Sequence, residues 1–335
     1  MISNSFKTNE LDHYRLSIAP MMDCTDRHFR VLMRQITKKS LLYTEMIVAQ
    51  ALHFSKNRNK LLDFDEIEHP ISIQLGGDNP NLLSEAAQIA EDWGYDEINL
   101  NIGCPSPKVK SGNFGACLME RPKVVANCIE KMKQSCNLPI TVKHRLGIDN
   151  LDSDDYLLQF VDNCSIAGAE RFIVHARKAW LNGLNPKENR TIPPLQYERV
   201  QKLKNNRPNL IIELNGGINS IEDCIRALKI FDGAMIGRSV YSHPFIWKEI
   251  DSTIYGQKKE YLSRSRIIKK MIPFAQKHIE NDGRLWQISK HILNLIENIP
   301  NAKKLRQELS EKCQNQKADV SILKKIAQQL EDAGQ

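Results

Sequence analysis

Residues 97–147 decide the fold, because two strand-like runs, EINLNIG (97–103) and ITVKHRLG (140–147), flank one segment of helix length. Pro122 stands where the first helical turn of that segment is expected. The apolar residues after it repeat at intervals of three and four, as in an amphipathic helix: Val124, Val125, Cys128, Ile129 and Met132. The stretch therefore predicts one strand–helix–strand unit with parallel strands.

The same alternation extends in both directions along the chain. The other strand-like runs are LSIAPMM (16–22), LLYTEMI (41–47), ISIQLGG (71–77), RFIVHAR (171–177), LIIELNGG (210–217) and GAMIGR (233–238). Eight such runs predict an α/β fold, a (β/α)8 TIM barrel. An open doubly wound sheet is the alternative, and it is less favoured because no G-x-G-x-x-G follows the first run.

The pattern changes after residue 245, where strand-like runs stop. Helices are expected over about 261–280, 284–298, 301–313 and 319–333. We therefore predict a catalytic barrel over residues 1–245 and a small all-helical C-terminal domain over 246–335. Residues 251–335 hold 16 Lys/Arg and 10 Asp/Glu, whereas the first 250 residues hold 31 and 30. This basic segment indicates either a polyanionic partner or an ordinary lysine-rich helical surface, and charge alone slightly favours the second.

Composition excludes several classes of protein. No apolar run reaches the roughly 20 residues of a membrane span, and the first residues, MISNSFKTNELDHYRL, lack the apolar core of a signal peptide. A cytoplasmic protein is therefore expected. The eight cysteines form no C-x-x-C pair, and no Cys/His cluster has the spacing of zinc ligands. We expect neither a metal site nor a disulfide framework.

Unusual residues gather in the second half of each strand-like run: Pro20, Glu45, Gln74, Asn99, Asn101, Lys143, Arg145, His175, Arg177, Asn215 and Arg238. Polar groups inside a barrel are costly unless they are paired or face a ligand. Any one of them could be a satisfied core residue, but their spread over all the strands favours an active site. In this fold the active site forms at the C-terminal ends of the strands.

Two glycine-containing turns predict the phosphate end of this site. NGGI (215–218) follows the seventh run and GRS (237–239) follows the eighth. Backbone N–H groups of Gly216, Gly217 and Gly237 can approach an anion closely, and Arg238 can add a charge-assisted hydrogen bond. Because the loops after strands seven and eight are the usual phosphate site of this barrel, a phosphorylated ligand is expected.

A second group of residues suits a flat aromatic cofactor. The sequence APMM (19–22) provides small and soft side chains, Gln74 an amide, and Lys143 a cation of the kind that stabilises a reduced flavin. Gln74 and His175 could equally be structural hydrogen-bonding groups. A lysine that points into a barrel has few structural explanations.

Cys104 follows the fourth run, in NIGCPSP (101–107), and Pro105 and Pro107 stiffen that loop. A thiol with the usual pKa of about 8.5 is mostly protonated at neutral pH, so Cys104 can act as a general acid. A thiolate nucleophile paired with a base is the competing mechanism, and an inert buried cysteine is the structural alternative.

Together these motifs resemble the tRNA-dihydrouridine synthases, most closely their A-type subgroup. The stretches that carry the resemblance are APMMDCTDRHFR, YTEMI, QLGG, INLNIGCPSPKV, TVKHRLG, FIVHARKAWLNGLNPKENRTIPPL, NGGI and IGRSVYSHP, which span residues 19 to about 244. Cys24 departs from the family pattern: an aromatic residue is expected at this position in many relatives.

The resemblance implies bound FMN, NADPH as reductant, and reduction of a D-loop uridine at position 20 or 20a of a tRNA. It implies that FMN is held by Pro20, Met21, Met22, Gln74, Lys143, His175, Asn215, Gly216, Gly217, Gly237 and Arg238. It makes Cys104 the proton donor to C5 of the uracil and places Asn101 beside the base. It assigns tRNA contacts to Lys187, Arg190, Lys303 and Arg306. A monomer that binds neither DNA nor a membrane is expected.

Three other functions are compatible with the residues alone. A flavin barrel could reduce a free pyrimidine or another small ene substrate. A flavin-free lyase could use Lys143 as a Schiff base at the same phosphate site. A barrel without activity could simply bind RNA.

Overall fold

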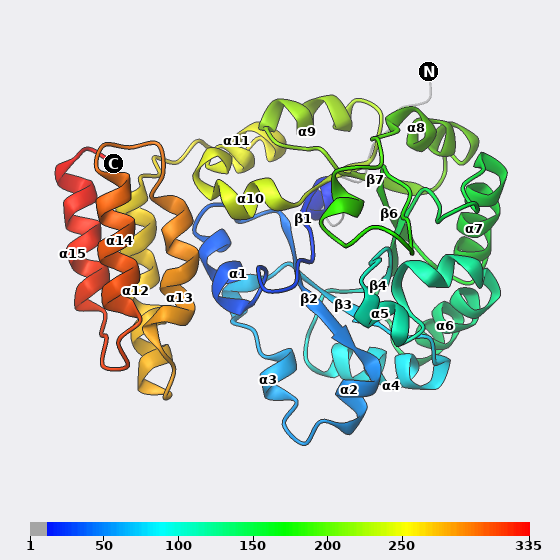
Figure 1. Cartoon of the computed structure of the whole chain (residues 1–335), viewed down its shortest axis with the longest axis horizontal. Helices are drawn as coiled ribbons and strands as arrows, with labels where there is room; N and C mark the ends of the chain where they lie inside the picture. The colour runs from blue at the N-terminus through cyan, green and yellow to red at the C-terminus, as the bar shows by residue number, and fades with distance from the viewer. Residues whose placement is uncertain (1–11) are drawn as a thin grey trace.

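The computed structural model describes residues 12–335, in which eight parallel strands close into one barrel in chain order (Figure 1). They are β1 (Leu16–Ile18), β2 (Leu41–Val48), β3 (Ile71–Gly76), β4 (Glu97–Ile102), β5 (Ile140–Arg145), β6 (Arg171–His175), β7 (Ile211–Asn215) and β8 (Gly233–Ile236). Pairing of β1 with β8 closes the sheet. The predicted (β/α)8 barrel is confirmed. The first eleven residues lie outside the described residues. They make up most of the N-terminal segment that was predicted not to be a signal peptide.

Most strands end one or two residues before the strand-like runs predicted from the sequence, and β1 ends four residues before. The run 16–22 ends as a strand at Ile18, since Pro20 has no N–H to donate to a neighbouring strand. The run 210–217 ends at Asn215, because Gly216 and Gly217 have φ values of 108° and 73°. The residues left over form the loops at the C-terminal rim of the barrel.

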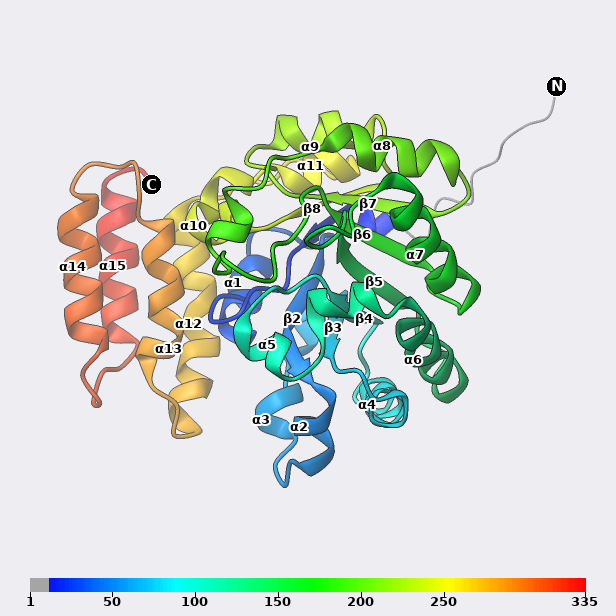
Figure 2. The ribbon, with the colours of Figure 1, turned by 45° about the vertical axis from the view of Figure 1, so that its right-hand side comes forward.

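Helices surround the barrel, as Figure 2 shows for α4, α6 and α7. The helices of this part are α1 (Arg27–Arg34), α2 (Ala49–Phe54), α3 (Asn59–Leu62), α4 (Pro80–Asp92), α5 (Pro107–Ser111), α6 (Pro122–Ser135), α7 (Asp154–Ile166), α8 (Tyr197–Asn206), α9 (Ile221–Leu228), α10 (Arg238–Ser242) and α11 (Ile250–Tyr255). In α6, which begins at Pro122 as predicted, four residues of the apolar stripe are fully buried against the sheet: Val125, Cys128, Ile129 and Met132. Burial of such a side chain stabilises the fold by about 1.5–3 kcal/mol.

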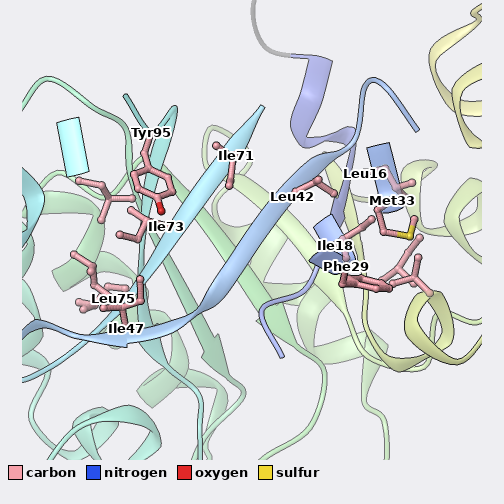
Figure 3. Packing of buried hydrophobic residues seen from close by; sticks show 14 of the residues in the cluster. Leu16, Ile18, Phe29, Met33, Leu42, Ile47, Ile71, Ile73, Leu75 and Tyr95 are labelled. Atoms are coloured by element: carbon pink, nitrogen blue, oxygen red, sulfur yellow. The ribbon is translucent and has the colours of Figure 1, made fainter. Parts of the chain in front are cut away.

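Two apolar layers hold the barrel together. The larger layer lies between the sheet and the helices and continues into the C-terminal helices. Figure 3 shows part of it, with side chains from β1, β2, β3 and α1. The smaller layer lies inside the barrel and consists of Ala19, Leu41, Tyr43, Ile173 and Met235. Because side chains alternate along a strand, every second residue of each strand faces this interior.

A buried ionic network lies inside the barrel, below the rim; we call it the Arg171 cluster and define it as Ser17, Tyr43, Glu97, Arg171 and Glu213. The Arg171 guanidinium donates to Glu97 Oε2 at 2.7 Å and to the Tyr43 hydroxyl at 2.9 Å. Its Nε lies 3.4 Å from Glu213 Oε2, and the Ser17 hydroxyl donates to the other oxygen of Glu213. All five residues are buried, so their charges depend on one another.

Four helices form the C-terminal bundle: α12 (Arg264–Glu280), α13 (Leu285–Ile292), α14 (Ala302–Cys313) and α15 (Ser321–Asp332). Figure 1 shows them side by side at one flank of the barrel, with α13 next to α1. The expected helix 284–298 is shorter than predicted. It passes into a 3-10 turn (Leu293–Leu295), and Asn298 and Asn301 then adopt left-handed φ values of 53° and 60° on either side of Pro300.

Helix α11 packs with the barrel although it follows the boundary predicted at residue 245. Asp251 Oδ1 accepts a hydrogen bond from the Thr37 hydroxyl at 2.6 Å. The Tyr255 hydroxyl bonds both the N–H and the carbonyl of Leu16 at 3.1 Å. The division into residues 1–245 and 246–335 stays a prediction, and these contacts attach residues 251–255 to the first part.

Asp26 joins the barrel to the bundle. It accepts the backbone N–H of Phe29 as the N-cap of α1, and it lies 2.9 Å from Lys290 Nζ and 2.8 Å from His291 Nε2 of α13. His28 packs edge-on against His278 of α12, with ring centroids 4.5 Å apart. Hydrogen bonds and charge from His291 and Lys290 lower the pKa of Asp26 against the opposing effect of burial. Burial lowers the pKa of His28 to about 3.

Asp26→Asn is expected to destabilise the protein by about 1–3 kcal/mol at pH 7, since Asn keeps the cap but loses the ion pair with Lys290 and the carboxylate that faces His291. A carboxylate whose folded pKa is depressed contributes stability above its unfolded pKa of about 4 and loses it below. The difference between variant and wild type should therefore shrink as pH falls below about 4. Urea unfolding at pH 7 and pH 3 measures this, and a deficit that stays constant with pH would refute the role of charge.

Acid should also weaken the wild type through His28. Its folded pKa lies below its unfolded value, so the unfolded chain binds more protons between about pH 6.5 and 3. This loss begins at a higher pH than the loss from Asp26, and Asp26 moderates it, because the charge of Asp26 raises the pKa of His28.

Candidate active site

The C-terminal strand ends bring together several of the predicted site residues. The strand register pairs Asn101 with Lys143 and His175 with Asn215. Lys143 Nζ donates a hydrogen bond of 3.1 Å to Asn215 Oδ1, across the intervening strand β6. Residues from β4, β5, β6 and β7 thus line one end of the barrel interior.

Three amide side chains form an ordered chain beneath this rim. Asn101 Nδ2 donates to Gln74 Oε1 at 2.8 Å, and Gln74 Nε2 donates to Asn99 Oδ1 at 2.8 Å. Asn99 Nδ2 in turn donates to the Thr141 hydroxyl at 2.9 Å. Gln74 is 1% exposed. The NH2 group of Gln74 still has a second hydrogen, and its amide oxygen still has a second lone pair, with which to bond a ligand.

Cys104 is half-buried in the loop after β4, and its backbone is held from two sides. Asn101 Oδ1 accepts the N–H groups of Gly103 and Cys104 at 3.1 and 3.0 Å. The Cys104 carbonyl accepts the N–H of Ala116 at 2.9 Å. A Cβ on Gly115 would lie 2.6 Å from that carbonyl oxygen, and Gly115 has a φ of 75°. Only glycine therefore allows this close approach, a requirement that the sequence pattern did not reveal.

Charge at the rim depends on burial. Burial lowers the pKa of Lys143 to about 8, and the positive charge of Arg145 acts in the same direction, whereas Glu213 opposes it. Burial, followed by Arg145 and Lys143, holds the pKa of His175 well below its usual value. The imidazole is therefore neutral at pH 7, while Lys143 keeps a proton that it can lose within one or two pH units.

Arg145 has a structural role that the sequence did not assign. Its Nε donates to the Gly103 carbonyl at 2.9 Å, next to Cys104. Its Nη1 donates to the carbonyls of Lys178 and Asn189 at 3.1 and 3.0 Å. The guanidinium therefore connects the cysteine loop to the long loop after β6. The sequence signal was an arginine at a strand end, in KHR (143–145).

The loop between β6 and α8 is ordered around Asn189, which is fully buried. Asn189 Nδ2 donates to the carbonyls of Trp180 and Leu184, and its Oδ1 accepts the Trp180 N–H at 2.8 Å. This arrangement fixes a 3-10 turn (Glu188–Arg190). Lys187, just before the turn, and Arg190, its last residue, are exposed. Lys303 and Arg306 lie elsewhere, exposed on the first turns of α14 in the bundle.

The loops after β7 and β8 lie together at the same rim. Asn215 Nδ2 donates to the Met235 carbonyl at 2.9 Å, and the Ser239 hydroxyl donates to the Asn219 carbonyl at 3.2 Å. Gly216 and Gly217 have left-handed φ values. No described atom lies within 4 Å of a Cβ built on Gly237. Exposed backbone and the exposed Arg238 suit a phosphate group.

The β1 loop contributes Pro20 and Met21, which are half-buried, and Met22, which is 56% exposed. Met21 packs against the interior cluster. The Thr25 hydroxyl accepts the N–H of Met21 at 3.0 Å and bonds its carbonyl at 3.2 Å. Half-buried Cys24 lies in the same loop.

The described residues contain no group of His, Cys, Asp or Glu side chains arranged to hold a metal ion. Within residues 12–335, no helix is long and apolar enough to cross a bilayer.

A barrel with a lysine, a row of amides and two glycine-containing loops at one rim has the features of barrel enzymes that bind a phosphorylated cofactor. The chain belongs to the dihydrouridine synthase family, whose model, "Dihydrouridine synthase (Dus)", matches residues 17–332. This family performs flavin-dependent reduction of uridine in tRNA, and the chain is a flavin-dependent oxidoreductase.

Several similar proteins carry the name tRNA-dihydrouridine(20/20a) synthase. The protein from Synechocystis is 52% identical over 296 residues, which cover 88% of each chain. The protein from Shewanella oneidensis is 43% identical and covers 99% of this chain and 98% of its own. A solved structure of a 2-naphthoyl-CoA reductase complex shares the fold, with a TM-score of 0.54 and 11% identity over 70% of this chain and 49% of that one.

Proposed function

We propose that the protein reduces the C5=C6 bond of uridine at position 20 or 20a in the D-loop of tRNA, with FMN as cofactor and NADPH as reductant. The observation that carries the proposal is the position of Cys104, which the Asn101 side chain and Arg145 hold at the same rim as Lys143. The names of the relatives support the choice of tRNA position. The proposal includes a monomer in the cytoplasm, where its tRNA substrate is found, without a role for DNA.

The side chains and backbone groups at the rim have the chemistry needed to bind FMN. The residues that would hold it are Pro20, Met21, Met22, Gln74, Lys143, His175, Asn215, Gly216, Gly217, Gly237 and Arg238. The glycines and Arg238 suit the phosphate, the amides suit the polar edge of the ring, and Met21 supplies an apolar surface. FMN, when bound, supplies the hydride that goes to C6 of the base.

Each remaining step belongs to side chains of the protein. Lys143, fixed by Asn215 Oδ1, supplies a positive charge that stabilises an anionic reduced cofactor. His175, held neutral, can give or accept a hydrogen bond without adding charge. The Cys104 thiol gives its proton to C5 of the uracil, and Asn101 and Arg145 keep the thiol in place.

The uridine must leave the folded RNA before it can reach the rim. Lys187 and Arg190 are exposed on the loop after β6, and Lys303 and Arg306 are exposed on α14. We propose that these four cations bind phosphates on two sides of the flipped nucleotide. Such contacts position the RNA and make its affinity depend on salt.

Gly217→Ala is expected to weaken FMN binding by about tenfold. A Cβ on Gly217 would lie 2.4 Å from the Tyr197 hydroxyl, which donates to the Gly216 carbonyl at 2.8 Å. The methyl group would displace Tyr197 and shift the peptide groups at the anion site. Flavin fluorescence titration measures the affinity. Gly183→Ala is the matched control, because its φ of 84° brings similar strain but no described atom lies within 4 Å of the new Cβ. Equal affinities in the two variants would count against the anion site.

Lys303→Glu combined with Arg306→Glu is expected to lower tRNA affinity by at least about tenfold at 100 mM salt and to flatten the salt dependence. Lys131→Glu combined with Lys229→Glu makes the same charge change near the C-terminal ends of α6 and α9, at the opposite face of the barrel. Filter binding over a range of KCl concentrations compares the pairs. A similar loss in both would indicate a general effect of charge and not a contact by α14.

The proposal is tested with purified, FMN-loaded protein, NADPH and unmodified tRNA transcript, with free uridine as the competing substrate. Dihydrouridine should form at position 20 or 20a of the transcript, and free uridine should not react. Equal reduction of free uridine would favour a small-molecule reductase. A colourless protein that borohydride traps on Lys143 with a carbonyl substrate would favour a lyase, and tRNA binding without reduction would favour an RNA-binding barrel.

A further inference from the structure

The two carboxylates of the Arg171 cluster are bound unequally. Glu97 receives two hydrogen bonds from Arg171 and further ones from Tyr43, Ser72 and Thr141. Glu213 is fully buried, but its Oε2 atom lies 3.4 Å from Arg171 Nε and has no hydrogen-bond partner among the described residues. Arg171 therefore offsets most of the negative charge of Glu97 but only part of the negative charge of Glu213.

The strand register places Glu213 in the same row as Lys143. Lys143 pairs with Ile173, and Ile173 pairs with Glu213. Registered neighbours point to the same face of a sheet, and Ile173 belongs to the interior cluster, so all three side chains face the barrel interior. Asn215, which accepts the hydrogen bond from Lys143, follows Glu213 by two residues on β7.

Within the Arg171 cluster itself, Arg171 is the one cation for two buried carboxylates, Glu97 and Glu213. Lys143 is the cation in the same row of the sheet as Glu213. The other buried cation of β5, Arg145, is held by backbone carbonyls at the rim. We propose that Glu213 is a positioning residue that keeps Lys143 in its charged form at the cofactor site. The inference rests on the proposed function, since that function assigns Lys143 to FMN.

The surroundings of Lys143 leave this role to Glu213. The groups that act on its charge are Arg145 on its own strand, Cys104 after β4, His175 on β6 and Glu213 on β7. Arg145 and burial favour the neutral amine, and His175 is neutral. A Cys104 that serves as a proton donor carries no charge. Among these groups of the described chain, Glu213 is the carboxylate that offsets the effect of burial.

The test is the pH dependence of the midpoint potential of bound FMN, measured from pH 6 to pH 10 in the full-length protein. In the wild type the slope should change near the pH at which Lys143 loses its proton, about 8. In Glu213→Gln this break should move down by about one pH unit or more. Glu97→Gln removes the other carboxylate of the cluster and is the comparison variant. Because Glu97 acts on Lys143 only through Arg171 and Glu213, the break should move by clearly less than in Glu213→Gln.

Two further variants keep the test decisive. Glu213→Asp retains the charge at a greater distance, so it should move the break in the same direction by less, and it serves if the Gln variant does not fold. In a Lys143→Arg background, in which the cation cannot lose its proton, Glu213→Gln should leave the profile without such a break. An unchanged break in Glu213→Gln, or in Glu213→Asp if only that variant folds, would overturn the inference while the proposed function stands. A wild-type protein that binds no FMN would overturn both.

Discussion

Cys104→Ala is expected to reduce dihydrouridine formation by about 10²–10⁴-fold, the usual contribution of a general acid. The loss should appear in the chemical step, because the methyl group has no proton to give to C5 of the base. Affinities for FMN and tRNA should stay within about twofold, since the backbone hydrogen bonds of the loop do not involve the thiol. Single-turnover reduction of tRNA by pre-reduced enzyme measures the step.

Cys24→Ala is the matched control for this experiment. Cys24 is also half-buried at the rim, in the β1 loop, and the proposal gives it no part in proton transfer. Its replacement should leave the rate nearly unchanged. A Cys104→Ala enzyme that retains the wild-type rate, or a Cys24→Ala enzyme with the larger defect, would exclude Cys104 as the proton donor.

Arg171→Met is expected to destabilise the protein by about 3–5 kcal/mol at pH 8, because it leaves Glu97 and Glu213 buried without their cation. Burial already raises the pKa of Glu213 to about 7 against the effect of Arg171. A carboxylate whose folded pKa is raised costs stability above its unfolded pKa of about 4.3. The deficit of the Met variant should therefore grow as pH rises from 5 to 8.

Arg207→Met is the comparison for this variant. Arg207 pairs with Asp162, but both side chains are about one-third exposed, so solvent screens the pair and the loss should be much smaller than in Arg171→Met. Urea unfolding at pH 5 and pH 8 measures both variants. If the two substitutions cost the same, or if the Arg171 deficit does not depend on pH, the interior charges do not act as the cluster indicates.

The barrel was predictable because eight apolar runs alternate with helix-length segments, and apolar burial dominates the stability of such a sheet. The strand ends were less predictable, because residue type does not mark them. Polar residues such as Gln74 and Lys143 lie within strands, whereas β7 ends just before Gly216. The rim residues were identified because burying polar groups at the strand ends of an apolar barrel costs free energy unless they are paired or face a ligand.

The Arg171 cluster was not predicted, although its residues lie at alternate positions with the site residues. Glu97 precedes Asn99 by two residues, and Glu213 precedes Asn215 by two. The alternation predicts that these side chains face the interior. Only closure of the barrel shows which of them meet, since Tyr43, Glu97, Arg171 and Glu213 come from four different strands.

The bundle was predictable as four helices from apolar spacing, but its contact with the barrel was not. That contact depends on Asp26, Lys290 and His291, which are ordinary surface residue types in the sequence. The positions of Lys303 and Arg306 relative to the rim likewise depend on how the bundle packs against α1.

The most direct test of the central claim is a map of dihydrouridine in tRNA from cells that lack this gene. The proposal predicts loss of the modification at positions 20 and 20a while other D-loop positions keep it. Wild-type protein expressed from a plasmid should restore it, and Cys104→Ala at equal protein level should not. Unchanged dihydrouridine at these positions in the deletion strain, or full restoration by the Ala variant, would contradict the account.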